Sequence, residues 1–158
     1  MIENPDQLTK LINLGVYVIG VRDAQRRNAF TASWVMQVSF DPLLLALSIN
    51  PSHYSYPILK AGGVCAINVL GEHQFHVAEH FGRSEPDKMD GFGWFSARTG
   101  APVLADGLAF FDCSVSHYCD AGDHMLAVCK VLQAAKLNNG QPLCYAQTGD
   151  LDGSSELY

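Results

Sequence analysis

Charged side chains are scarce in this sequence, and positive charge is concentrated nowhere along it. Lys, Arg, Asp and Glu together make up 16% of the 158 residues, and the formal net charge is −6. Proteins that bind nucleic acids neutralise phosphates with clustered Lys and Arg, and the pair Arg26-Arg27 is too short for that. We therefore expect no nucleic-acid partner. Hydrophobic residues reach 48%, which permits some surface to be covered in an oligomer.

Paired cysteines are also missing. The cysteines are five in number, scattered and without a C-x-x-C pair: Cys65, Cys113, Cys119, Cys129 and Cys144. Most of them lie in apolar, strand-like runs, where a free Cys behaves as a small hydrophobic residue. This pattern argues against structural disulfides and zinc fingers and favours a reducing compartment.

No hydrophobic run approaches the length of a membrane-spanning helix, and Leu43–Ile49 is far too short. The first residues, Met1–Lys10, are acidic and polar, unlike the basic and then apolar pattern of a secretory signal peptide. We expect a cytoplasmic protein with no membrane partner.

Two catalytic motifs are absent as well. Without G-x-S-x-G there is no sign of a hydrolase nucleophile elbow, and without G-x-G-x-x-G any nicotinamide cofactor must bind outside a Rossmann frame.

His73, His76 and His80 fall on one face of a predicted helix, a pattern that zinc ligands can show. Ligands on one straight helix rarely converge on one ion, and the alternative is an ordinary polar face. We predict no metal site.

What the sequence does contain is a succession of short, β-branched and apolar segments. They predict strands over Leu14–Val21, Ala29–Phe40, Leu43–Ile49, Val64–Leu70, Trp94–Ala97, Leu108–Tyr118, His124–Leu137 and Leu143–Thr148. Short helices are predicted at Pro5–Asn13, Ile58–Ala61 and Gly71–Gly82. About seven strands with only short helices favour a mainly β fold, a closed antiparallel barrel. The length suits one domain.

Two polar runs stand out, Asn28–Trp34 and Ala46–Ser55. Both combine small hydroxyl residues with Ala, which supply short donors and acceptors and let a flat ligand approach the backbone. Ser55 suits the N-cap of the next helix and Pro57 its first turn. A helix start lined with Ser52, His53 and Ser55 would suit a phosphate. A planar ring beside a phosphate describes flavin mononucleotide, although these residue types are also ordinary in turns and caps.

Several motifs follow one another in an order that resembles the flavin reductase-like family of FMN-binding split barrels. They are Gly15–Gly20, Thr31–Trp34, Val38–Pro42, Cys65–Leu70, Gly100–Leu104, Cys113–Val115 and Gly122–His124. The same motifs are similar to the flavin reductase-like domains joined to flavodiiron proteins. The resemblance implies a split β-barrel of the FMN-binding type with short peripheral helices, and a single flavin-binding domain over residues 1–158.

The resemblance also implies a site. Thr31, Ala32, Ser33 and Trp34 would line the flavin ring. The ribityl chain would follow Ser48, Ile49 and Asn50, and the phosphate would be held by Ser52, His53 and Ser55. A basic residue is expected near that phosphate, with Lys60, Arg83 and Lys88 as candidates. In Gly122-Asp123-His124, His124 would be the catalytic residue facing the nicotinamide, although this motif is also an ordinary turn. The family usually carries a Gly shortly afterwards, where this chain has Met125–Cys129.

The implied function is electron transfer from NAD(P)H to flavin or a downstream acceptor by an FMN-binding oxidoreductase, with FAD as a second option. Such a flavin reductase is expected to form a homodimer and to meet a redox partner protein. One alternative is a flavoredoxin-like electron carrier that does not use NAD(P)H directly. Another is a flavin- or haem-binding module without turnover, although no C-x-x-C-H haem attachment motif is present.

Overall fold

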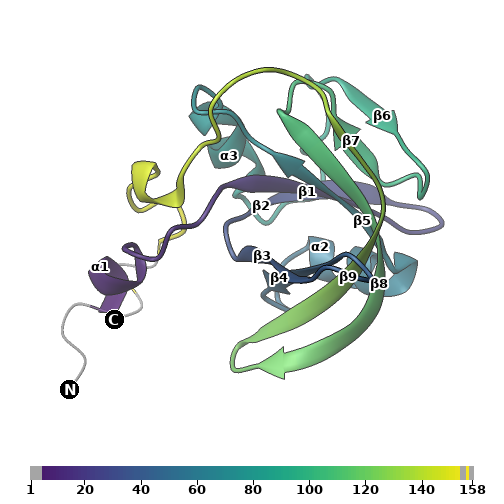
Figure 1. The fold of residues 1–158 in the computed structure, drawn as a ribbon, viewed down its shortest axis with the longest axis horizontal. Helices are drawn as coiled ribbons and strands as arrows, with labels where there is room; N and C mark the ends of the chain where they lie inside the picture. The colour runs from purple at the N-terminus through teal and green to yellow at the C-terminus, as the bar shows by residue number, and fades with distance from the viewer. Residues whose placement is uncertain (1–4, 154–155, 157–158) are drawn as a thin grey trace.

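The computed structural model describes residues 5–153 and residue 156. Its main element is an antiparallel sheet that curls round on itself, with a small second sheet packed against it (Figure 1). The seven strands of the large sheet lie in the order β2-β1-β5-β8-β9-β4-β3. Their bounds are β1 Tyr17–Arg22, β2 Arg27–Ala32, β3 Val35–Ser39, β4 Leu44–Ile49, β5 Val64–Val69, β8 Ala109–Ala121 and β9 His124–Lys136. The predicted mainly β, antiparallel architecture is confirmed.

The predicted strand Ala29–Phe40 is wrong, because the chain breaks at Ser33-Trp34 into two strands. β2 and β3 lie at opposite edges of the seven-stranded sheet, yet only these two residues join them. The amide of Val35 donates to the carbonyl of Ser33 at 3.0 Å, and the amide of Ser48 on β4 donates to the carbonyl of Trp34 at 3.0 Å. The break turns the polar run into a corner between the two edges of the sheet.

Both faces of the central strands are buried, which explains why they read as continuous apolar runs rather than alternating ones. On β1, Ile19 and Val21 belong to the core inside the barrel. Val18 points the other way and packs with Phe81 and Leu104 in a second core outside the barrel. The outer core is covered by the helix α3 (Phe75–Phe81), as the interstrand and helix contacts indicate (Figure 1).

The small sheet, β6 (Trp94–Ser96) with β7 (Pro102–Leu104), is held against β1 and β5 by a buried amide. Asn68 is fully buried. Its Nδ2 donates to the carbonyl of Val18 at 2.9 Å, and its Oδ1 accepts the amide of Leu104 at 2.9 Å. Gly20 lies under the same hairpin, where a Cβ would come within 2.0 Å of the carbonyl oxygen of Pro102. Asn68 therefore pairs with buried backbone groups of neighbouring strands.

The helices differ from the predictions mainly in their ends. α1 is shorter than predicted, Pro5–Thr9, and α2 is longer, Ser55–Gly62. Ser55 is not the N-cap, because Tyr54 occupies that position and makes no side-chain cap bond; Pro57 does lie in the first turn. The predicted helix Gly71–Gly82 is reduced to α3, because Gly71 forms a bridge with Pro142 instead.

The predicted closing strand Leu143–Thr148 is also wrong. A single isolated bridge forms there, Gly15 with Cys144, and a 3₁₀ turn follows, η1 (Tyr145–Gln147). All five cysteines are free: Cys65, Cys113 and Cys129 are buried, while Cys119 and Cys144 are exposed. Among the described residues, no helix is long and apolar enough to cross a membrane.

The Asn68 amide gives a test of this packing. We expect Asn68→Ala to lower the free energy of unfolding by about 2–4 kcal/mol, because it removes several bonds and leaves a buried amide and carbonyls unpaired. Urea denaturation measures the change, and Asn139→Ala, at an exposed position, is the matched control. Equal stability of the two variants would contradict the role given to Asn68.

Candidate flavin and nicotinamide site

One pocket gathers the two polar runs and the β8–β9 turn, which are far apart in the sequence. It has a volume of about 160 Å³ and lies at the corner between β2 and β3. Every predicted site residue except Ser52 and Ser55 lines it: Thr31, Ala32, Ser33, Trp34, Ser48, Ile49, Asn50, His53 and His124. The fold thus brings these residues together, while their individual roles stay predictions.

Thr31 has a structural bond in addition to its place in the pocket. Its hydroxyl donates to the carbonyl of Ala78 on α3 at 2.6 Å, which ties the helix to β2. The hydroxyl hydrogen is therefore already used, and a ligand meets the lone pairs of the oxygen and the neighbouring backbone. Ala32 is buried and Trp34 is 46% exposed, so the wall of the pocket is part backbone and part indole ring.

The turn after β4 is held by one side chain. Oδ1 of Asn50 accepts the amide of Ser52 at 2.9 Å and the hydroxyl of Ser52 at 2.8 Å. The Ser52 hydroxyl therefore points back to Asn50 rather than into the pocket. This local bond explains why Ser52 does not line the pocket, although its exposed position leaves its oxygen accessible.

His53 is a neutral ring with a defined tautomer. Burial, and next to it the positive charge of Lys88, lowers the pKa of His53 to about 4. Its Nδ1 accepts the amide of Ser55 at 3.2 Å, so the proton of the neutral ring sits on Nε2, where it can be donated to a ligand. The ring also packs on Phe30, with the ring centroids 5.2 Å apart.

Ser55, which does not line the pocket, has an unpaired polar atom close to His53 in the sequence. The residue is completely buried, and its hydroxyl oxygen has no hydrogen-bond partner among the described residues. A buried hydroxyl without a partner costs free energy unless a ligand satisfies it. This orphan lies two residues from His53, at the first residue of α2.

The structure separates the three candidate basic residues. Lys60 lies over the ring of Tyr118, with Nζ 4.0 Å from the ring centroid. Arg83 is exposed. Lys88, in contrast, is only 2% exposed and acts electrostatically on His53. Burial lowers the pKa of Lys88 to about 8, and its Nζ donates to the carbonyls of Phe81 and Arg83. Lys88 is therefore the cation associated with the His53 end of the pocket.

His124 reaches the pocket from the tight turn between β8 and β9. Gly122 adopts a φ of 68°, and His124 lies opposite Ala121 as the turn closes. Its ring packs on Trp34 at a centroid distance of 4.9 Å, and Nδ1 lies 2.7 Å from Oδ1 of Asp123. The hydrogen bond to His124 lowers the pKa of Asp123. The carboxylate therefore orients the ring and leaves Nε2 for a ligand.

Sequence reasoning missed two residues of the pocket, Phe30 and Asp152. Phe30 is hidden within an apolar strand pattern. Asp152 is 120 positions beyond Ala32, and only the return of the C-terminal segment beside Leu14 brings it there, as the bond from the amide of Tyr145 to the carbonyl of Leu14 shows. No local pattern signals such a return.

The predicted histidine face does not form a cluster. His73 lies outside α3 with its side chain 93% exposed beside Glu72. His80 is turned the other way, and its Nε2 bonds to the carbonyl of Lys88 at 2.8 Å. These histidines serve separate contacts, and the absence of a metal site stays a prediction.

The residues present fit a flavin mononucleotide. A flat wall of backbone, Ala and Trp suits the ring, and the neutral His53 at one end suits a phosphate. Lys88 and the orphan hydroxyl of Ser55 do not line the pocket; they are buried behind this end of it.

The comparison with known proteins agrees with this fit. The family described as flavin reductase like domain matches residues 9–153. This chain belongs to that family. A relative from Rhizobium meliloti (strain 1021), named "Probable flavin reductase", is 36% identical over 85% of this chain and 43% of its own length. The FMN reductase (NADH) RutF of Agrobacterium fabrum (strain C58 / ATCC 33970) is 33% identical over 82% of this chain and 75% of its own length.

A diflavin flavoprotein of Synechocystis sp. is 30% identical over 80% of this chain, which spans only 23% of that protein. The resemblance to such fused domains is thereby confirmed. Among solved structures, the NADH:FAD oxidoreductase SgcE6 of Streptomyces globisporus has a TM-score of 0.83 and 23% identity, over 94% of this chain and 93% of that one. The chain therefore has the FMN-binding split-barrel fold that its motifs predict.

The neutral state of His53 makes stability depend on pH. Its pKa falls from 6.5 to about 4 on folding, so the unfolded chain binds more protons between these values. The contribution of His53 to the free energy of unfolding is then complete above about pH 6.5 and is lost as the pH falls towards 4. We expect wild type to lose about 1–2 kcal/mol more than His53→Gln between pH 7 and 4.5 in urea denaturation, because solvent screens part of the effect at this half-buried ring. His117→Gln, at an exposed histidine, should lose as much as wild type; equal losses in all three would contradict the assignment.

Proposed function

We propose that this chain is an FMN-binding oxidoreductase, an NAD(P)H-dependent flavin reductase that passes electrons to flavin or to a downstream acceptor. One observation carries the proposal: a pocket in a flavin reductase-like fold joins a flat wall, the neutral ring of His53 at one end and the positioned ring of His124. Bound FMN would supply the chemistry, by accepting a hydride and passing electrons on. The names of RutF, an FMN reductase with NADH, and SgcE6, solved with NAD and FAD fragments, support the nucleotide donor and leave FAD as a second flavin.

In this proposal different residues hold the ring, the ribityl chain and the phosphate of the flavin. Thr31, Ala32, Ser33 and Trp34 flank the ring, and the ribityl chain follows Ser48, Ile49 and Asn50. The phosphate lies at Ser52, His53 and Ser55, with Lys88 supplying the positive charge. A dianion there accepts the Nε2 proton of His53 and satisfies the Ser55 hydroxyl. These bonds replace the hydrogen bonds to water that the His53 ring and the Ser55 hydroxyl lose by burial.

His124 is the proposed catalytic residue. Because Asp123 engages Nδ1, the ring presents Nε2 to the nicotinamide or to the flavin edge, where it holds or releases a proton. The carboxylate of Asp123 stabilises the charged ring when it is protonated. The packing on Trp34 keeps the ring over the pocket.

A homodimer is part of the proposal. Strand β3 is a sheet edge and exposes Met36 (62%) and Val38 (46%), and Phe40, directly after the strand, is 91% exposed. Large apolar side chains grouped on a sheet edge usually mark a covered surface. This edge continues from Trp34, so a second copy on it would place the pocket close to the interface. The single domain over residues 1–158 and the cytoplasmic location stay predictions.

A second function is an electron carrier fed by a redox partner protein without direct use of NAD(P)H. The segment Met125–Cys129, where the family usually has a Gly, favours this alternative. In the structure Met125 is the second residue of β9 and lies opposite Ile49 of β4, so a side chain larger than that of Gly stands beside the pocket wall at this point.

Anaerobic stopped-flow mixing of FMN-loaded protein with NADH or NADPH tests the function. Rapid loss of oxidised-flavin absorbance would establish the reductase and its donor. If this absorbance is lost with dithionite but with neither nucleotide, the electron carrier is favoured. Failure to load FMN would overturn the proposal. A Soret band in the purified protein would indicate the haem-binding module instead.

We expect His124→Ala to slow flavin reduction by about 10²–10⁴-fold, the usual contribution of a positioned acid–base group, with little change in flavin affinity. His117→Ala, an exposed histidine on the same hairpin, is the matched control. An unchanged reduction rate in His124→Ala would remove the role assigned to it.

The phosphate end can be tested with riboflavin, which lacks the phosphate. We expect His53→Gln to weaken FMN binding by about 10–100-fold, because a charge-assisted hydrogen bond is lost, and to leave riboflavin binding nearly unchanged. Flavin fluorescence titration measures both. If the two flavins lose affinity equally, the phosphate does not lie at His53.

A further inference from the structure

The tip of the β1–β2 hairpin places two positive charges directly opposite each other. Arg22 and Arg27 are cross-strand partners, and directly opposed residues of an antiparallel pair project from the same face. Like charges in this arrangement destabilise the hairpin. This pairing of two arginines is unexpected in a chain with a net charge of −6. Acidic residues outnumber basic ones, and a nearby carboxylate would relieve the repulsion between the two guanidinium groups.

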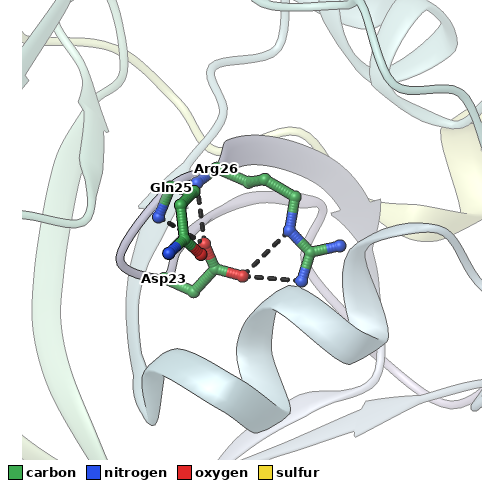
Figure 2. A network of polar contacts seen from close by, with 3 residues as sticks. All are labelled: Asp23, Gln25 and Arg26. Atoms are coloured by element: carbon green, nitrogen blue, oxygen red, sulfur yellow. Dashed lines mark hydrogen bonds and ion pairs between the residues drawn. The ribbon is translucent and has the colours of Figure 1, made fainter.

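The obvious carboxylate is already fully used. Oδ1 of Asp23 accepts the amides of Gln25 and Arg26 at 2.9 and 2.7 Å. Its Oδ2 accepts Nε and Nη2 of Arg26 at 2.9 and 2.6 Å, so the guanidinium folds back onto it (Figure 2). These bonds lower the pKa of Asp23. Asp23 therefore neutralises Arg26 and has no acceptor capacity left for Arg22 or Arg27.

Arg22 and Arg27 are left without an ion-pair partner in the part of the chain that the structure describes. Both are exposed and line a hollow of about 260 Å³ together with Ser96 and the paired Asp23 and Arg26. Arg22 is also placed by its surroundings. Its Nη1 lies against Gly100, where a Cβ would come within 2.4 Å. With Gly at position 100, the guanidinium can lie directly against the backbone.

We propose that this hollow is an oxyanion site, in which Arg22 and Arg27 together bind a phosphate-class dianion. Guanidinium groups bind phosphate through paired, charge-assisted hydrogen bonds, and a dianion between two of them replaces their repulsion by attraction. The site is separate from the flavin pocket, because the hairpin tip lies at the opposite end of β2 from Thr31 and Ala32. It does not depend on the proposed function.

Thermal unfolding of FMN-saturated protein in Hepes tests the site, with the flavin phosphate position already filled. At equal ionic strength, we expect inorganic phosphate at tenfold excess over its Kd to raise the Tm of wild type by about 3–6 °C relative to chloride. In Arg27→Gln and in Arg22→Gln the rise should fall to about 1 °C or less. Phenyl phosphate distinguishes a free phosphate ion from a phosphate ester: protection by both indicates that the hollow admits an ester, and protection by phosphate alone indicates the free ion.

Lys136→Gln is the matched control, because it also removes one exposed positive charge. Through the strand register, Lys136 aligns with Ala109, Val69 and Tyr17, at the other end of β1 from Arg22. This variant should keep the full phosphate effect. Without phosphate and at low salt, Arg27→Gln should be at least as stable as wild type. Equal phosphate protection of wild type and both Arg variants would overturn the site, even if FMN failed to bind.

Discussion

The short link between the two edges of the sheet is the constraint from which the rest of the structure follows. Neighbouring strands lie about 4.8 Å apart, so the edges of a flat seven-stranded sheet would be separated by about 29 Å. The chain from Ala32 to Val35 spans at most about 11 Å. β2 and β3 are nevertheless the two edges, and the sheet must therefore curl until they nearly meet. The barrel is closed by this corner rather than by a complete ring of strand pairs.

The same corner creates the pocket. Curling the sheet brings the end of β2, the end of β4 and the β8–β9 turn to one place, so that Trp34 contacts His124 although 90 positions separate them. The β4 turn and the loop after α3 then enclose His53 and Lys88. Desolvation lowers the pKa of both groups, and Ser55 is buried without a partner. These are unfavourable arrangements for an empty pocket and favourable ones for a pocket that receives an anion.

A similar imbalance marks the opposite end of β2. Asp23 and Arg26 satisfy each other within the turn (Figure 2), whereas Arg22 and Arg27 face each other without relief. Local interactions thus shape both ends of the strand. At each end, polar groups remain that the described chain itself does not satisfy. The pocket end suits an anion because its polar groups are buried, and the hairpin tip suits one because two positive charges oppose each other there.

The sequence by itself determined most of the strands and the residue types of the site. Buried strands such as Val64–Val69 are visible as β-branched runs, and the ordered motifs identify the family and most of the pocket lining. The tertiary structure alone decided the break at Ser33-Trp34, because no breaker residue marks it and only the closing of the sheet requires it. It also decided that Lys88 is the cation beside His53, that Asp152 joins the pocket, and that Arg22 opposes Arg27. Each depends on which distant segments meet, and strand register and chain return over long separations leave no local pattern in a sequence.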